Sequence, residues 1–93
     1  MKSLFVVAKE RVQEVLDSEH IYDFPTLIKK VREATGLAQC YVIKETKLMY
    51  LSFFESEKRF KEPTDRDLIT LAKYYEVPLH LLIAKKNKFM RTQ

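Results

Sequence analysis

The sequence predicts an all-α protein, a compact bundle of five to six short helices. Three observations indicate this fold class. The chain has one glycine and three prolines, too few for the turns that an all-β chain requires. Apolar residues recur at the 3.6-residue period of a helix in several segments. At 93 residues, of which 46% are hydrophobic, the chain has room for one small domain.

The first expected helix covers residues 3–18. Its apolar residues follow one another at spacings that place them in one stripe, namely Leu4, Phe5, Ala8, Val12, Val15 and Leu16. A polar and aromatic connector follows, and residues 1–24 form the first part of the chain. The stripe packs either on the rest of the same chain or on a second copy, and we favour a part in dimerisation.

The second expected helix begins at Pro25, because proline is tolerated in a first turn, and it ends at Gly36, which can adopt the left-handed conformation. Its buried face is formed by Leu27, Ile28, Val31 and Ala34. Two short helices follow. The first covers residues 38–46 and buries Val42 and Ile43, and the second covers about 47–56. Helices this short need neighbours to be stable.

The second of these helices carries Leu48, Leu51 and Phe54 or Phe53. Residues 57–62 form a charged loop, and Pro63 and Thr64 begin a fifth helix. The apolar face of the fifth helix is formed by Leu68, Ile69, Leu71, Ala72 and Tyr75. Pro78 then starts a final short helix, whose core residues are Leu79, Leu82 and Ile83. This helix runs into a basic tail, so that residues 25–84 form the second part of the chain and residues 85–93 the third.

The net charge of +4 is concentrated towards the C-terminus. The tail carries four basic residues and no acidic one, which suits attraction to a polyanion and equally suits a solvated helix end: Lys85, Lys86, Lys88 and Arg91. The single cysteine, Cys40, excludes an internal disulfide, favours a cytoplasmic protein and is expected to be buried or half-buried. No apolar run reaches the ~18 residues of a membrane span, so we expect no membrane association.

Two motifs resemble the phage-repressor or Cro-type helix-turn-helix family, also called XRE, over residues 26–83. LIKKVREATGLAQ at residues 27–39 is similar to the opening helix of that family, its glycine stop and the glutamine that begins its next helix. PTDRDLITLAKYYEVPLHLL at residues 63–82 is similar to its Pro-Ser/Thr helix start, Leu-Ala-Lys run and Val-Pro-Leu restart. The resemblance implies a lambda-repressor-like helix-turn-helix within the bundle.

Two registers fit the segment between these motifs. Aligned without gaps, Lys47 falls on the family's turn glycine, Leu48 on the buried turn residue and Phe53 on the buried position of the recognition helix. Alternatively, SFFESEKR at residues 52–59 resembles the Ser-x-x-Glu-x-Gly-x-Arg element of the family, which shortens the preceding turn and lengthens the following loop. Glu76 departs from the family's usual glycine at its helix stop.

The resemblance implies a repressor-like transcriptional regulator that binds double-stranded DNA as a homodimer and docks a short recognition helix in the major groove. Gln39 matches the family's glutamine and is the best candidate to contact a base or phosphate. Five basic side chains are candidates to neutralise phosphates, namely Lys44, Lys47, Lys58, Arg59 and Lys61. Tyr50 and Ser52 place polar groups on the exposed face of the recognition helix.

An alternative is that the protein has the same fold, has lost DNA binding, and uses the central helix for protein interaction or oligomerisation. Residues 49–56 contain no arginine, asparagine or glutamine, the side chains that read base edges in pairs of hydrogen bonds. A protein partner would contact Met49, Phe53 and Phe54. Glu55 and Glu57 would repel phosphates if they faced the DNA. We find no motif for catalysis, a cofactor or a metal, and expect a protein that is not an enzyme.

Overall fold

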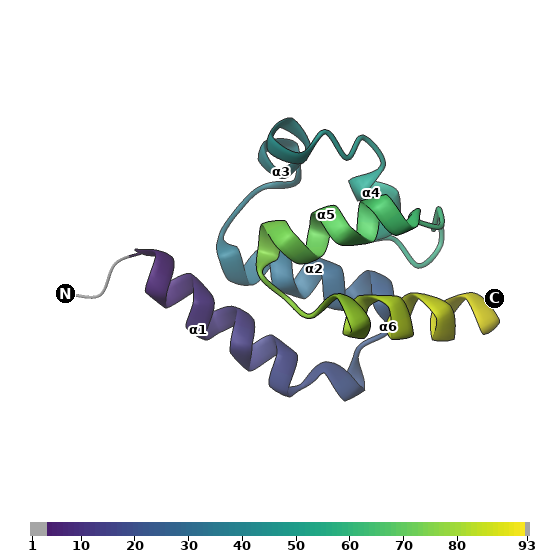
Figure 1. The fold of residues 1–93 in the computed structure, drawn as a ribbon, viewed down its shortest axis with the longest axis horizontal. Coiled ribbons are helices and arrows are strands. Elements are labelled where there is room, and N and C mark those ends of the chain that lie inside the picture. Colours follow the sequence, from purple (N-terminus) through teal and green to yellow (C-terminus); the bar gives the residue numbers. More distant parts are fainter. Residues whose placement is uncertain (1–3, 93) are drawn as a thin grey trace.

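The structure is a computed structural model that describes residues 4–92, with side chains from Ala8 onward. The described chain is all-helical and has no strand, as predicted. Figure 1 shows the helices in chain order, and their bounds are α1 (Leu4–Asp17), η1 (Glu19–Ile21), α2 (Phe24–Thr35), α3 (Gln39–Thr46), α4 (Leu51–Phe54), α5 (Asp65–Tyr75) and α6 (Leu79–Arg91). No helix in this range is long and apolar enough to cross a membrane.

Helix α1 packs against α2 and lies at the outer, lower left side of the bundle in Figure 1. Val12 is buried in this contact, and Val15 and Leu16 are half-buried against the core. The stripe expected from the sequence therefore packs on its own chain. Its first members, Leu4 and Phe5, have side chains outside the described residues.

Helix α2 forms the centre of the core and begins and ends as the sequence predicts. The Asp23 carboxylate accepts a hydrogen bond from the backbone N–H of Thr26 at 3.0 Å, which caps the first turn. Gly36 ends the helix with φ of 77°, a conformation that is strained for side chains other than glycine. Between these ends the helix buries Phe24, Pro25, Leu27, Ile28 and Val31.

The expected helix at residues 47–56 is wrong in extent, because α4 is a single turn. Lys47 adopts a left-handed conformation with φ of 65°, which ends α3, and residues 47–50 form a turn. The side chains of Leu48 in the turn and of Leu51 and Phe54 in α4 are buried in the core. This turn of helix is held by its packing, since so short a helix has no stability of its own.

Helix α5 has the predicted start and an unexpected exposed residue. Thr64 and Asp67 form a capping box, in which each side chain accepts a hydrogen bond from the other residue's backbone N–H. Ile69 was expected in the core and is 40% exposed. Glu76 ends the helix with φ of 56° and so takes the left-handed position without glycine.

The final helix is longer than predicted, because α6 continues through the expected basic tail to Arg91. Phe89 is buried, and its ring lies edge-on to Phe60 with centroids 4.7 Å apart, which holds the C-terminal half of α6 on the bundle. Ile83 was expected in the core and is 37% exposed. Two corrections concern single residues on α3: Cys40 is exposed, and Ile43 is only half-buried.

Two lysines of the expected tail have partners within the chain. The Lys85 ammonium donates to the backbone carbonyls of Glu19 at 2.6 Å and Tyr22 at 2.7 Å, and it lies 3.0 Å from the Glu19 carboxylate. Lys86 forms an ion pair with Glu62 at 3.1 Å. These contacts tie α6 to η1 and to the loop before α5, so neither lysine is a free cation.

We predict that Lys85→Met lowers the free energy of unfolding by about 2 kcal/mol, because it removes charge-assisted hydrogen bonds to the carbonyls of Glu19, which begins η1, and Tyr22, which follows it. Urea denaturation measures the change. Lys88→Met on the exposed side of the same helix is the control, and its effect should stay within ~0.5 kcal/mol. Equal effects of the two substitutions would contradict a structural role for Lys85.

Candidate nucleic-acid interface

Helix α3 lies at the top of Figure 1, and α4 and the loop at residues 55–64 follow it down the right-hand side. A buried ion pair fixes this region to α2. Arg32 Nε donates to Glu55 Oε2 at 2.8 Å, and Arg32 Nη2 donates to Glu55 Oε1 at 3.1 Å. The side chains are 12% and 2% exposed, so the pair is shielded from water. The hydrogen bond to Glu55 raises the pKa of Arg32, which keeps its charge.

Gln39 completes this network from the first turn of α3. Its Nε2 donates to Glu55 Oε1 at 2.8 Å, and Arg32 Nη1 donates to the carbonyl of Leu37 at 2.8 Å. Glu55 therefore faces inward and cannot repel phosphates at the surface. Gln39 is half-buried, and one N–H of its amide is engaged within the chain. The remaining donor and acceptor of the amide are the groups that it can offer to DNA.

The exposed part of the region is an aromatic–cation patch formed by Tyr50, Phe53, Arg59 and Lys61. The rings of Tyr50 and Phe53 have centroids 6.0 Å apart and planes at 55°. The Lys61 ammonium lies 3.7 Å from the Tyr50 centroid, and the Arg59 guanidinium lies 5.2 Å from the Phe53 centroid. Tyr50 is 48% exposed and Phe53 is half-buried. Each ring is thus paired with a cation from the following loop.

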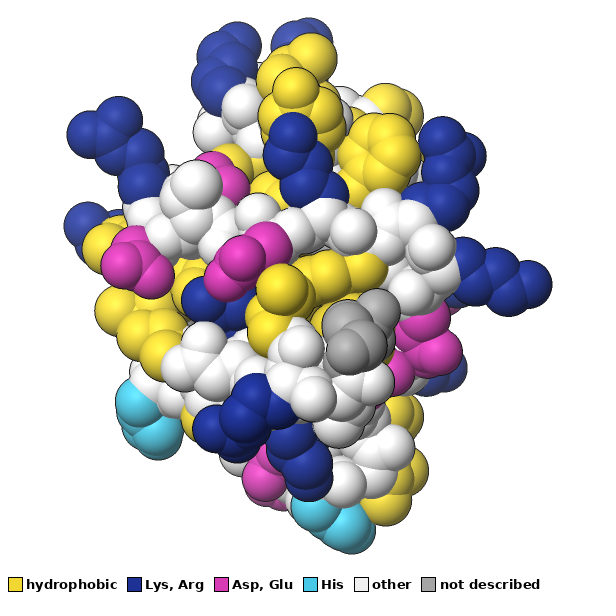
Figure 2. Space-filling view, turned by 90° about the vertical axis from the view of Figure 1, so that its right-hand side faces the viewer, with side chains coloured by type: hydrophobic (Ala, Val, Ile, Leu, Met, Phe, Trp, Pro, Cys, Tyr) yellow, Lys and Arg dark blue, Asp and Glu magenta, His cyan; other side chains and the backbone are white. Residues whose placement is uncertain are grey.

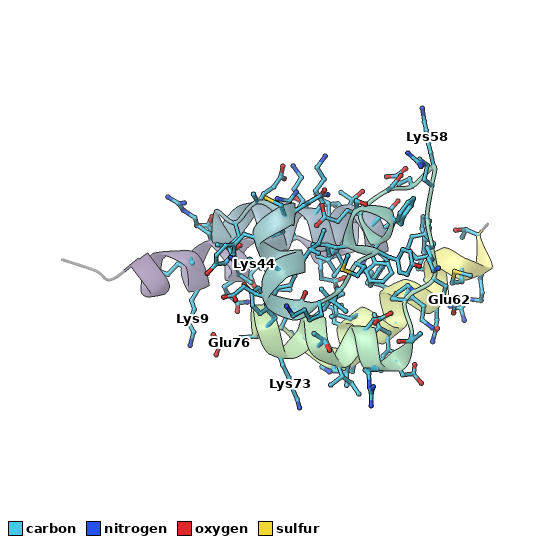
Figure 3. The ribbon with its side chains drawn as sticks, turned by 90° about the horizontal axis from the view of Figure 1, so that it is seen from above. Lys9, Lys44, Lys58, Glu62, Lys73 and Glu76 are labelled. Carbon is cyan, nitrogen blue, oxygen red and sulfur yellow. The ribbon has the colours of Figure 1, made fainter. Side chains whose placement is uncertain are left out.

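Other predicted contact residues surround the patch to different degrees. Lys47 lines a hollow of about 280 Å³ together with Tyr50 and Lys61. Ser52 is exposed on α4. In Figure 3, Lys58 projects from the loop away from the bundle. Lys44 lies on α3, well apart from Lys58. The eight predicted residues therefore do not form one continuous face, and Lys44 is the outlying member.

None of the five predicted phosphate-binding cations has a carboxylate partner among the described residues: Lys44, Lys47, Lys58, Arg59 and Lys61. This distinguishes them from the partnered Lys85 and Lys86. Figure 2 shows the end of the molecule that carries the loop, where hydrophobic side chains at the surface lie between lysine and arginine side chains. Positive charge and apolar surface are therefore combined in this region.

The partner surface expected at Met49, Phe53 and Phe54 is partly wrong. Met49 is 69% exposed, but Phe54 is 2% exposed and belongs to the core. The exposed apolar surface instead includes the ring of Tyr50, of which only the hydroxyl was predicted to make a contact. Phe54 is buried because it lies one helical turn after Leu51 on the same face of α4.

Two lysines of α2 near the loop were missed by the sequence reasoning. Lys29 and Lys30 line a hollow of about 560 Å³ between α2 and the loop, together with Lys58 and Arg59. Both are exposed, and the helical period places them opposite the buried face of α2, which is the signal that could have identified them. Three carboxylates line the same hollow, Glu33, Glu55 and Glu57, so its charge is mixed.

Tyr75 lies beside the buried ion pair and has an unusual hydroxyl. The residue is 5% exposed, and its hydroxyl has no hydrogen-bond partner among the described residues. Burial, followed by the negative charge of Glu55, raises the pKa of Tyr75 well above its usual range. The hydroxyl therefore stays protonated to a higher pH than that of an exposed tyrosine.

We predict that Glu55→Gln lowers the free energy of unfolding by about 3 kcal/mol, because it leaves the charge of Arg32 buried without compensation. Chemical denaturation at neutral pH measures the loss. Glu57→Gln, at an exposed position on the same loop, is the control and should change stability by less than ~0.5 kcal/mol. A loss at Glu55 no larger than at Glu57 would show that the ion pair does not hold the fold.

We predict that Tyr75→Phe leaves stability at pH 7 unchanged or raises it by up to ~1 kcal/mol, since the hydroxyl makes no hydrogen bond. Above pH ~10 the unfolded chain ionises this tyrosine and the folded chain does not, so the wild type loses stability as the pH rises. The variant lacks this contribution and its stability should fall less steeply. Unfolding midpoints between pH 8 and 11 test this, with Tyr50→Phe at an exposed ring as the control. Parallel curves would contradict it.

The described residues contain no cluster of three or more His, Cys, Asp or Glu side chains that could hold a metal ion. Comparison with known proteins finds no match, since no family model, curated protein or solved structure is significantly similar to this chain. The likeness to the Cro-type family therefore rests on the motifs at residues 27–39 and 63–82.

Proposed function

We propose that the protein is a DNA-binding transcriptional regulator of the repressor-like helix-turn-helix type, with α3 and α4 as its helix pair. The observation that carries this proposal is the set of loop cations beside α4, Lys58, Arg59 and Lys61, which are exposed and lack carboxylate partners. Lysine and arginine side chains of this kind neutralise DNA phosphates and release bound counterions. The buried ion pair of Arg32 and Glu55 supports the proposal because it sets the position of helices α3 and α4 relative to α2.

In this proposal most of the affinity comes from the phosphate backbone. Helix α4 spans four residues, about 6 Å at the usual rise of a helix, and cannot lie along a major groove in the way that a longer recognition helix does. It also has no arginine, asparagine or glutamine. Gln39, Tyr50 and Ser52 are left to contact base edges, and sequence selectivity should be weak.

The proposed DNA-bound form is a homodimer. One copy offers few phosphate contacts, and two copies separated by one turn of DNA, about 34 Å, would double them. Since the described part of α1 packs on α2 of the same chain, its stripe is not freely available as the dimer interface. A dimer would therefore form through another surface or on the DNA itself.

A second candidate function is protein interaction through the same patch. The specific observation in its favour is the exposure of Met49, which is 69%, next to the exposed ring of Tyr50. Apolar side chains grouped at a surface frequently mark protein contacts. This candidate requires no phosphate binding, so a measurement of DNA affinity separates the two.

We predict that the protein binds double-stranded DNA at low salt, and that the logarithm of its affinity falls linearly with the logarithm of the salt concentration. Arg59→Ala should reduce that slope by about 1, because one phosphate contact is lost. Fluorescence anisotropy with a labelled duplex measures both. Lys73→Ala, which removes an exposed lysine of α5 on a different side of the molecule (Figure 3), is the charge-matched control and should leave the slope unchanged.

Absence of any salt-dependent association would overturn the DNA-binding proposal and leave the protein-interaction function. Equal reductions of the slope by the substitutions at Arg59 and Lys73 would indicate non-specific attraction to a basic protein. In that case the face of α3, α4 and the loop would not be the binding surface.

A further inference from the structure

The exposed side chains of α4 and the turn before it match the faces of nucleic-acid bases better than their edges. Met49, Tyr50 and Phe53 offer flat or apolar surface, and only the hydroxyls of Tyr50 and Ser52 can form hydrogen bonds. A closed duplex presents base edges in its grooves, while its base faces are hidden in the stack. Bases that are unpaired present their faces, on which aromatic side chains stack.

The geometry of the two rings favours separate bases over a stacked pair. Tyr50 and Phe53 have centroids 6.0 Å apart and planes tilted by 55°. Neighbouring bases in a duplex strand are parallel and about 3.4 Å apart, so two stacked bases cannot lie on both rings at once. A strand whose bases are splayed apart can place one base on each ring.

The cations of the patch are placed to hold the backbone that joins such bases. Lys61 lies 3.7 Å from the Tyr50 centroid, and Lys47 lines the same hollow. Arg59 lies 5.2 Å from the Phe53 centroid. Contact with an aromatic ring stabilises an exposed cation less than stacking on the ring stabilises a base. A base can therefore displace the cation, which is then available to bind a phosphate. The positive charge of the patch complements the negative charge of the strand.

We infer that the aromatic–cation patch binds unpaired bases of a single-stranded nucleic acid, and that it binds them more tightly than a closed duplex. Tyr50 and Phe53 stack on the bases, and Arg59, Lys61 and Lys47 bind the phosphates between them. This inference rests on the proposed function, because the same loop cations hold the backbone in both cases. It adds that the bound nucleic acid has bases outside their stack.

The test compares three labelled probes of about 12 nucleotides per strand at one salt concentration, using the full chain and fluorescence anisotropy: oligo(dT), oligo(rU) and a mixed-sequence DNA duplex. Oligo(dT) and oligo(rU) do not pair with themselves, so their bases are available. We expect at least one of the single strands to bind more tightly than the duplex. The stronger of the two shows whether the patch prefers a DNA strand or an RNA strand.

Substitutions at Tyr50 test the stacking itself. Tyr50→Leu retains apolar surface without a π face and should weaken binding of the preferred single strand about tenfold, a larger factor than for the duplex, in which Tyr50 can reach only a base edge. Tyr50→Trp should restore binding. Tyr50 makes no side-chain capping bond to α4, and thermal unfolding confirms that each variant is folded. Tyr41→Leu is the matched control, since Tyr41 is 47% exposed on α3 outside the patch.

Two results overturn the inference and leave the proposed function in place. One is a duplex that binds as tightly as both single strands, and the other is a loss at Tyr50→Leu no greater than at Tyr41→Leu. Absence of measurable binding to all three probes overturns the inference and the proposed function together.

Discussion

The buried ion pair of Arg32 and Glu55 is the interaction on which the arrangement of α3 and α4 depends. Removing two charges from water is expensive, and a buried pair of this kind adds little net stability compared with an apolar contact of the same shape. Its value lies in geometry. Glu55 accepts three hydrogen bonds, two from Arg32 and one from Gln39, and so connects α2, the start of α3 and the end of α4. A single helical turn could not hold its position without such a connection.

The basic residues divide into those used inside the fold and those left outside it, and net charge alone does not distinguish them. Lys85 and Lys86 contribute to the excess of positive charge at the C-terminus, yet they hold η1 and the loop before α5. The loop cations Lys58, Arg59 and Lys61 lie earlier in the chain, where Glu55, Glu57 and Glu62 balance them in sequence. In space Glu55 is buried and Glu62 is paired with Lys86, whereas Glu57 is exposed and lines a hollow with Lys58 and Arg59, so the positive charge near the patch is only partly cancelled.

Local signals in the sequence were enough to predict most helix ends, because each end depends on one or two neighbouring residues. Gly36 ended α2 and Thr64 began α5 through contacts within four residues. The length of α4 was not predictable in this way, since Leu48, Leu51 and Phe54 have the spacing of a helix whether or not Leu48 is helical. The pairing of Arg32 with Glu55 and of Lys85 with Glu19 joins residues far apart in sequence, which no local pattern records. Of the candidate site, the residue types were predictable and their grouping was not.

The exposure of the aromatic rings of α4 follows from the brevity of this helix. On a helix of 3.6 residues per turn, two residues three apart share a face, and in α4 these are the buried Leu51 and Phe54. Phe53 then points to the flank of the helix, and Tyr50, at its start, points outward. A longer helix could have reached the core again at its next turn, but Glu55 enters the buried ion pair and the chain leaves the helix there. The apolar residues that this one turn cannot bury form the patch beside Arg59 and Lys61.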